Sequence, residues 1–176
     1  MIVFIDEVGF SFLARLGTTW APRGQPPLLR RLGSQRRELS TIVGLSLSGR
    51  IHKQHYRTAI CAADVVMFLM HLLQQHRQRL IVVLDRAGIH TAGLVDDFVA
   101  AQADSISLEW LPTCAPELNP EENCHGNVKT YLRNFTPHTA ADLCRLVDRG
   151  FARLRRRPDL ILGFFHHAGL PVKQLW

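Results

Sequence analysis

Residues 80–85, LIVVLD, place a carboxylate at the end of an uninterrupted apolar run. The five aliphatic side chains from Leu80 to Leu84 predict a β-strand that is covered on both faces, as strands of parallel sheets are. Asp85 ends the run, so burial is expected to stop where the carboxylate begins. A helix near residues 92–101 and a strand near residues 106–110 are expected to follow. This strand, helix, strand alternation is typical of parallel pairing.

A second acidic pair follows a short apolar run at the amino terminus. Residues 2–5, IVFI, are rich in β-branched side chains and predict a strand that delivers Asp6 and Glu7 at its carboxyl end. Sites in open α/β sheets form at the carboxyl ends of strands, so Asp6 and Asp85 are expected to approach each other if their strands are parallel neighbours. Two carboxylates about 4 Å apart repel by roughly 4 kcal/mol at an effective dielectric of about 20. Such a pair either shares a proton or holds a cation.

Two further strands and one long connection complete the predicted sheet. Residues 40–47 and 51–57 predict strands joined by a hairpin at Ser48-Gly49, which makes an antiparallel meander with the first strand and a mixed sheet overall. Residues 18–27, TTWAPRGQPP, predict an irregular connection in which Trp20 is the best candidate for an exposed aromatic side chain. Four arginines follow, and they are interpreted either as a solvated loop or as DNA contacts: Arg30, Arg31, Arg36 and Arg37.

Three helices are predicted outside that alternation. The first begins at Asp64 and has one buried stripe, formed by Val66, Leu69, Met70 and Leu73. The second begins at Asn119-Pro120, where Asn suits the cap and Pro the first helical position, and runs to about Arg133. The last opens at Thr139 and is stopped by Pro158. Its solvent face is expected to be basic, with Arg145, Arg149, Arg153 and Arg156.

Size, composition and charge restrict the class of protein. The 176 residues suffice for one well-buried domain, which is expected to span residues 1–176. Hydrophobic residues at 47% and charged residues at 20% are ordinary for a soluble globular protein. The net charge of +6 and the pI near 9.7 favour a polyanionic partner such as nucleic acid.

The cysteines and the amino terminus bear on the compartment. The spacing of the four cysteines fits neither a disulfide framework nor a zinc motif, which predicts free thiols in a reducing cytosol: Cys61, Cys114, Cys124 and Cys144. Residues 1–10 contain no basic leader, and no apolar run reaches the roughly 20 residues that span a bilayer. A cytoplasmic, nucleoid-associated protein without a membrane partner is expected.

A third carboxylate, Glu122, is expected in the first turn of the helix that begins at Asn119. Together with Asp6 and Asp85 it offers hard oxygen ligands, which favour Mg²⁺ or Mn²⁺. Two such ions about 3.5–4 Å apart activate an attacking oxygen and stabilise the leaving one at a phosphodiester. The residues alone leave an alternative open, in which the aspartates are ordinary strand-end residues and Glu122 is the partner in a capping box.

Four stretches carry a family resemblance. In order they are FIDEVGF at residues 4–10, TWAPRG at 19–24, VLD at 83–85 with Ile89-His90 beyond it, and PELNPEE at 116–122, which follows Leu111-Pro112 and precedes Lys129. Together they resemble the transposases of the mariner superfamily, especially its bacterial insertion-sequence branch. The P-E-L-N-P-x-E and F-x-D-E strings are specific, whereas the shorter pieces are only modestly so. The matches cover the chain from about residue 2 to 135.

The resemblance implies a fold similar to ribonuclease H and retroviral integrase, that is, an α/β fold with a mixed sheet flanked by helices. It also implies a DNA transposase that performs metal-dependent phosphodiester hydrolysis and strand transfer at transposon ends. Asp6, Asp85 and Glu122 would be the catalytic triad that binds two Mg²⁺ or Mn²⁺ ions. The ligand in N-P-x-E is the last residue, which selects Glu122 over Glu121, and the first motif selects Asp6 over Glu7.

The resemblance further implies DNA contacts and partners. The expected contacts are Arg86, His90, Lys129 and Arg133, with a solvated helix face as the alternative for the last two. The family usually has Asn at position 86 and Trp at position 125, and the guanidinium of Arg86 is expected to compete for Asp85. The expected partners are double-stranded DNA, a second copy of the chain in the active complex, and a separately encoded helix-turn-helix part. Alternatives are an inactive DNA-binding remnant and a structure-specific nuclease of the same fold.

Overall fold

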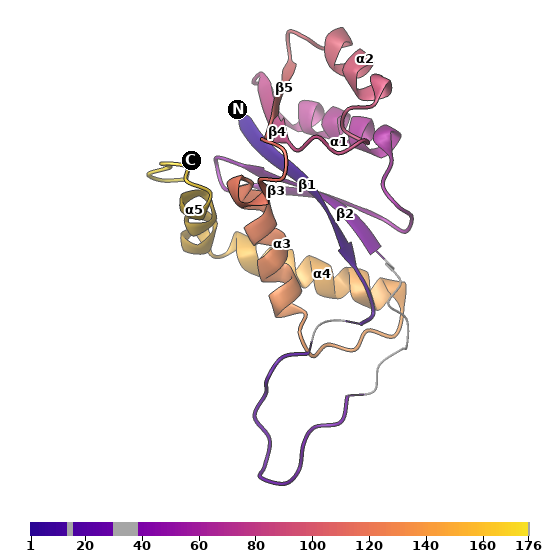
Figure 1. Ribbon diagram of the computed structural model, residues 1–176, viewed down its shortest axis with the longest axis vertical. Coiled ribbons are helices and arrows are strands. Elements are labelled where there is room, and N and C mark those ends of the chain that lie inside the picture. The colour runs from indigo at the N-terminus through magenta and orange to yellow at the C-terminus, as the bar shows by residue number, and fades with distance from the viewer. Residues whose placement is uncertain (14–15, 30–38, 176) are drawn as a thin grey trace.

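A mixed sheet of five strands forms the centre of the molecule. The computed structural model describes residues 1–13, 16–29 and 39–175 (Figure 1). The strands are β1 (Ile2–Phe10), β2 (Leu39–Ser46), β3 (Ile51–Tyr56), β4 (Leu80–Leu84) and β5 (Ile106–Trp110). Their order is β3-β2-β1-β4-β5, with antiparallel pairing among β1, β2 and β3 and parallel pairing of β4 with both β1 and β5. The predicted mixed sheet is confirmed.

Helices cover both faces of this sheet (Figure 1). The helices are α1 (Ala62–Gln75), α2 (Gly93–Ala101), α3 (Pro120–Tyr131), α4 (Ala140–Arg155) and α5 (Pro158–His167), with a short 3₁₀ turn η1 (Pro116–Leu118) before α3. One core lies between the sheet and α1 and α2, and a second lies between the sheet and α3, α4 and α5. Burial of apolar surface in these two layers is the main driving force for this architecture.

Strand β1 is longer than the sequence predicted, and this corrects the position of Asp6. The predicted strand ended at Ile5, but β1 continues to Phe10, because β2 pairs with it along its length, from Val3 to Phe10. Parallel pairing with β4 stops much earlier, at Phe4↔Val83. Asp6 therefore lies within β1 but just past the end of its parallel contact. Continuing that register by two residues on each strand brings Asp6 level with Asp85.

Alternation along β1 determines which face Asp6 occupies. Side chains of a strand point alternately to the two faces of the sheet. Val3 and Ile5 lie in the core beneath α1, whereas Phe4 and Val8 lie in the core beneath α3, α4 and α5. Asp6 shares the second face, which is the one that α3 covers.

The buried stripe of α1 is one position away from the predicted one. The side chains that pack on the sheet are Val65, Phe68, Leu69 and Leu72, while Met70 is exposed. Both sets have helical spacing, so periodicity alone cannot separate them. The observed orientation of α1 buries Phe68 completely in place of Met70. A buried aromatic ring contributes more to the free energy of unfolding than a thioether side chain does.

The helix that begins at Ala140 is not the last one, contrary to the prediction. It has the predicted cap at Thr139 and ends at Arg155, but a further helix, α5, begins at Pro158. Proline lacks an amide hydrogen, so it stops a preceding helix and is equally suited to the first position of the next. Ile161 and Phe165 of α5 are buried in the core shared with α3 and α4.

The connections agree with the sequence where they are described. Gly49 has a φ of +76° in the β2–β3 hairpin, where its amide donates to the carbonyl of Ser46 at 2.8 Å. Residues 18–27 form an irregular connection, and Trp20 on it is fully exposed. The basic cluster Arg30, Arg31, Arg36 and Arg37 lies outside the described residues. In the described ranges, no helix has both the length and the apolar character needed to cross a bilayer.

Candidate active site

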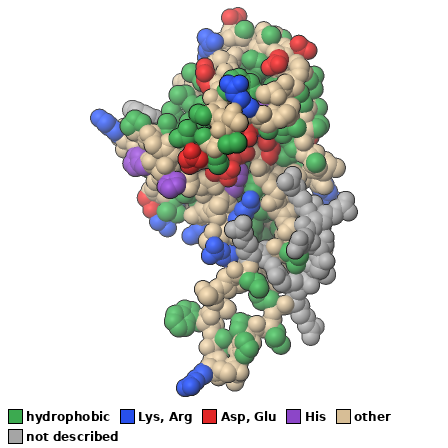
Figure 2. Space-filling view, viewed as in Figure 1, with side chains coloured by type: hydrophobic (Ala, Val, Ile, Leu, Met, Phe, Trp, Pro, Cys, Tyr) green, Lys and Arg blue, Asp and Glu red, His purple; other side chains and the backbone are tan. Residues whose placement is uncertain are grey.

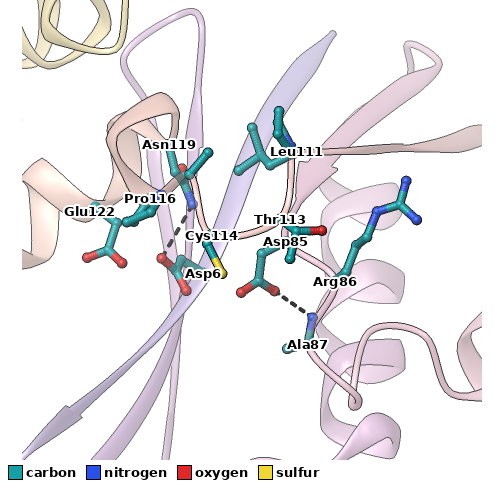
Figure 3. Close-up of a pocket in the computed structure, with 12 residues that line it drawn as sticks. Asp6, Asp85, Arg86, Ala87, Leu111, Thr113, Cys114, Pro116, Asn119 and Glu122 are labelled. Carbon is teal, nitrogen blue, oxygen red and sulfur yellow. Dashed lines mark hydrogen bonds between the residues drawn. The ribbon is translucent and has the colours of Figure 1, made fainter.

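A cleft of about 320 Å³ opens where β1, β4 and the start of α3 meet. Asp6 from β1, Asp85 just after β4 and Glu122 from the first turn of α3 all line it, together with the connection between β5 and α3. Figure 3 shows Asp6 between the other two carboxylates. The structure therefore brings together the three acids that the sequence selected.

Asp6 lies in an electrostatically unfavourable position. Burial raises its pKa to about 8, and the negative charges of Glu122, Glu7 and Asp85 add to that effect, outweighing the hydrogen bond from the amide of Glu7. A carboxyl group with this pKa keeps its proton over part of the neutral range unless a cation compensates the charge. The crowding of carboxylates around Asp6 is what a cation-binding site requires.

Asp85 is held by two hydrogen bonds to one of its oxygens. Its Oδ1 accepts from the amide of Ala87 at 3.0 Å and from Nδ1 of His90 at 2.7 Å. The other ring nitrogen of His90, Nε2, donates to Oε1 of Glu7 at 2.8 Å. Outer contacts of this kind orient the carboxylates that bind metals in proteins.

His90 is a buried cation between two acids. Its side chain is only 1% exposed, and burial by itself disfavours the charged ring. The hydrogen bond and charge of Glu7, followed by those of Asp85, outweigh burial and raise the pKa of His90 to about 9. The ring therefore donates from both nitrogens at neutral pH. No surface of His90 is left for the DNA contact expected from the sequence, and its position is that of a support for Asp85.

Glu122 is directed into the cleft and not toward the helix cap. Asn119 caps α3 through its side-chain oxygen, which accepts from the amide of Glu121 at 3.1 Å. In this described helix the side chain of Glu122 returns no hydrogen bond to the backbone of Asn119. Glu122 is therefore not the partner in a capping box. The side chain of Glu122 is 47% exposed and lines the cleft.

Asn119 links the helix cap to the first carboxylate. Its Nδ2 donates to Oδ2 of Asp6 at 3.3 Å and to the carbonyl of Ile5 at 3.4 Å. Because Asn119 is buried and also caps α3, it fixes the start of the helix that carries Glu122 against the strand that carries Asp6. Sequence reasoning assigned Asn119 only the cap.

Substitution of Asn119 separates these two roles. Asn119→Ala is expected to lower the free energy of unfolding by about 1–2 kcal/mol, through loss of the cap, and also to weaken Mn²⁺ binding. Asn119→Ser keeps a capping oxygen but is too short to reach Asp6, so it should retain most of the stability and still weaken Mn²⁺ binding. Urea unfolding and calorimetric Mn²⁺ titration measure the two effects. Equal Mn²⁺ affinity in Asn119→Ser and the parent would show that Asn119 is only a cap.

A second acid and histidine lie beneath α3. Glu121 is fully buried on the face that it shares with Cys124 and Val128, and its Oε2 contacts Nε2 of His125. Burial, with a smaller contribution from Lys129, lowers the pKa of His125 to about 3, so its ring is neutral. Nδ1 of His125 lies 3.8 Å from Glu122.

His125 consequently joins the acidic group. Ligand atoms of Asp6, Glu122 and His125 all lie within 4.8 Å of one another. Oxygen donors from carboxylates suit Mg²⁺ and Mn²⁺, and a neutral imidazole is tolerated better by Mn²⁺ than by Mg²⁺. The donor set of the cleft therefore fits divalent cations, with Asp6, Asp85, Glu122 and His125 as the side chains able to hold them.

The remaining expected DNA contacts lie at the surface around the cleft. Arg86 has its guanidinium carbon 5.9 Å from the ring centroid of Trp110, and Figure 3 shows it pointing away from Asp85. In the described part of the chain it makes no ion pair with Asp85, so the expected competition is not observed. Lys129 is exposed on α3, and Arg133 is exposed in the turn that follows it. Figure 2 shows acidic side chains in the middle of this face with Lys and Arg side chains below them.

Two supporting residues were missed by sequence reasoning. Glu7 was set aside in favour of Asp6, and its contact with His90 spans 83 positions of sequence. Asn119 was assigned only to the cap, although its contact with Asp6 spans 113 positions. The signal available for both was their presence inside the family-like motifs at residues 4–10 and 116–122.

Comparisons with known proteins agree with this architecture. The Mos1 mariner paired end complex with Mn has a TM-score of 0.69 and 22% identity, over 96% of this chain and 53% of that chain. The Mos1 transposase catalytic domain with raltegravir and Mn gives 0.57 and 20%, over 96% and 82%. The catalytic core domain of BIV integrase gives 0.51 and 12%, over 89% and 82%. These likenesses show a ribonuclease H-like fold, as predicted.

The chain spans about half the length of the Mos1 protein in the paired end complex. A search of curated proteins gave no match. A family model described as DDE superfamily endonuclease matches residues 1–144. Because that match spans most of the 176 residues, the chain belongs to the DDE superfamily endonucleases.

Proposed function

We propose that this chain, over residues 1–176, is the catalytic domain of a DNA transposase. Its reactions would be phosphodiester hydrolysis at transposon ends and transfer of the freed strand to target DNA. The observation that carries the proposal is the convergence of Asp6, Asp85 and Glu122 on one cleft of a DDE-family fold. Solved complexes of Mos1 with its transposon end, and a Mos1 strand transfer complex, have the same fold.

The three carboxylates lie on different elements around the cleft, and their positions suggest their roles. Asp6, within β1, and Asp85, just after β4, line the same cleft, so both are suited to the same cation. Glu122 approaches Asp6 from α3, with Nδ1 of His125 beside it, and is suited to a second cation. Bound Mg²⁺ or Mn²⁺ ions would activate the attacking oxygen and stabilise the leaving oxygen. His90 and Asn119 hold the carboxylates in place, and Arg86, Lys129 and Arg133 are suited to phosphate contacts at the rim.

A cation should stabilise the protein in a way that depends on pH and on Asp6. The pKa of Asp6 in the folded protein is about 8 and exceeds the ordinary 3.8. The contribution of Asp6 to the stability of the metal-free protein is therefore present below pH 4 and is lost as the pH rises through 8. Mn²⁺ has to displace the retained proton, so the rise in melting temperature that it causes should be larger at pH 8 than at pH 6.

The matched variant is Asp6→Asn. It should abolish most of the Mn²⁺-dependent rise in melting temperature. Without metal at pH 8 it should raise the free energy of unfolding by on the order of 3 kcal/mol, since each unit of pKa shift corresponds to about 1.4 kcal/mol and the half-buried site is partly screened by water. Thermal and urea unfolding measure both effects. A Mn²⁺ response that is the same in Asp6→Asn and the parent would contradict the assignment of Asp6.

End joining separates a transposase from a nuclease of the same fold. The chain is incubated with Mg²⁺, a labelled duplex that carries the ends of its own element, and a supercoiled plasmid. A transposase cleaves at the ends and produces labelled plasmid, whereas a structure-specific nuclease gives only cleaved duplex. If neither product forms and Mn²⁺ does not bind, the chain is a DNA-binding remnant and the proposal is wrong.

The proposal extends to the partners and the compartment. The substrates would be double-stranded transposon ends and target DNA in the cytoplasm, where the bacterial nucleoid lies. Cleavage of two ends in one complex requires two active sites, which favours a homodimer of this chain. Recognition of the ends would come from a helix-turn-helix part. The net charge of +6 supports an interaction with DNA.

A further inference from the structure

A second cluster of metal-ligating side chains lies away from the cleft, between β3 and α4. Its members are His55 on β3 and Cys144 and Asp148 on α4, and one ligand atom of each lies within 4.8 Å of the others. Cys144 and Asp148 are four residues apart, so they lie on one face of α4 in adjacent turns. Helix α4 packs against β2 and β3, which brings that face to the edge strand of the sheet.

The orientation of His55 is fixed by the neighbouring strand. His55 pairs with Thr41 across β2 and β3, and Oγ1 of Thr41 lies 2.8 Å from Nδ1 of His55. Nε2 of His55 lies 3.2 Å from the ammonium of Lys53 and 3.1 Å from Oδ1 of Asp148. Thr41 therefore holds Nδ1, and Nε2 is directed into the cluster, where it can bind a metal once it carries no proton. This is the arrangement that metal-binding histidines adopt.

A cation already lies beside two members of the cluster. The ammonium of Lys53 contacts Oδ1 of Asp148, and Nε2 of His55 lies 3.1 Å from the same oxygen. Lys53 therefore supplies a positive charge beside both His55 and Asp148, with its side chain 16% exposed.

We propose that His55, Cys144 and Asp148 form a binding site for Zn²⁺, which displaces the ammonium of Lys53 and fastens α4 to the edge strand β3. The combination of imidazole nitrogen, thiolate sulfur and carboxylate oxygen selects zinc over Mg²⁺. Ideal tetrahedral coordination places such ligand atoms roughly 3.3–3.8 Å apart, so rotation of side chains suffices to close the site. Water completes the fourth position.

The charges balance when zinc binds. Binding replaces the thiol proton of Cys144, which is released to solvent, by a zinc–sulfur bond. Thiolate and Asp148 then neutralise Zn²⁺, and Lys53 is left free to turn toward solvent. The site is independent of the catalytic carboxylates, because none of its ligands lines the cleft.

Zn²⁺ and Co²⁺ titrations test the proposal. The background is the double variant Asp6→Asn/Glu122→Gln in excess Mg²⁺, so that the cleft does not contribute. We expect Zn²⁺ to compete with a chromophoric chelator for this background, and Co²⁺ to give thiolate-to-cobalt absorption in the near ultraviolet. Cys144→Ser should remove that absorption and weaken Zn²⁺ affinity at least tenfold. Cys61→Ser, the same change at an exposed cysteine, should alter neither. Equal Zn²⁺ affinity in Cys144→Ser and the background would overturn the site.

Lys53→Met distinguishes a metal site from a simple ion pair. Without metal, the variant should melt at a lower temperature than the parent, because Asp148 loses its cation. Its affinity for Zn²⁺ should rise at least tenfold, since no ammonium has to be displaced, and added Zn²⁺ should restore the melting temperature. If Lys53→Met gains no Zn²⁺ affinity, the cluster is an ion pair between β3 and α4 and the proposal is wrong.

Discussion

Asp85→Asn is expected to abolish Mg²⁺-dependent nicking of DNA and to leave the fold intact. The amide oxygen of Asn can still accept from the amide of Ala87 and from Nδ1 of His90, so the loop after β4 keeps its hydrogen bonds. What disappears is the negative charge that faces Asp6 across the cleft. Removal of one member of an interdependent catalytic set typically costs about 10³-fold or more in rate.

The measurement is conversion of supercoiled plasmid to open circles by the parent and by Asp85→Asn at equal concentration. Asp97→Asn is the matched control, since Asp97 is exposed on α2 and lies outside the cleft. Thermal unfolding checks that all three proteins are folded. The control should nick like the parent. Undiminished nicking by Asp85→Asn would remove Asp85 from the active site, and with it the proposed mechanism.

Strand β4 was predictable because its burial produces a local pattern in the sequence. The run from Leu80 to Leu84 is apolar throughout, and the structure ends β4 at the residue predicted. The course of β1 was not predictable in the same way. Asp6 and Glu7 interrupt its apolar run, and only pairing with β2, which lies some 30 residues further along the chain, carries the strand on to Phe10. Tertiary pairing overrides local pattern at such a position.

The triad itself depended on resemblance for its third member. Local rules gave Glu122 two interpretations, capping partner or ligand, and the structure keeps the cap at Asn119 while Glu122 lines the cleft. The residues that hold the carboxylates in place could not be predicted, because the contacts of Glu7 with His90 and of Asn119 with Asp6 join residues that are distant in sequence. A side chain's partner on another element leaves no periodic signal. Sequence patterns therefore locate the carboxylates, and the fold supplies what holds them.

Some carboxylates around the cleft are paired with a cation of the protein, and others are not. Oδ1 of Asp85 and one oxygen of Glu7 are neutralised by the cationic ring of His90, so the positive charge behind the cleft is permanent at neutral pH. Asp6 and Glu122 have no comparable cation among the described contacts, and the raised pKa of Asp6 reflects this. The uncompensated charge is thus concentrated on the side of the cleft that α3 closes, which is where an added cation gains most.

His90→Leu is expected to show how much the fixed cation contributes. The change leaves Glu7 and Asp85 without their shared partner, and breaking a buried ion pair costs about 3–5 kcal/mol. Because the side chain of Asp85 is 56% exposed, a loss of about 2–4 kcal/mol in the free energy of unfolding is expected at pH 6. Mn²⁺ affinity should fall by about 10-fold to 100-fold, the usual effect of removing a group that orients a ligand.

The pH dependence identifies charge as the cause of that loss. The folded pKa of His90 is about 9 and lies above the ordinary 6.5, so its stabilising effect is fully present below pH 6.5 and is lost as the pH rises through 9. Urea unfolding at pH 6 and pH 9.5 should therefore show a large difference between parent and His90→Leu at the lower pH and a small one at the higher. Glu7→Gln, which removes the charge but keeps the shape, should reproduce part of the loss, and its effect should not add to that of His90→Leu. A deficit that is equal at both pH values would mean that His90 acts by packing and not by charge.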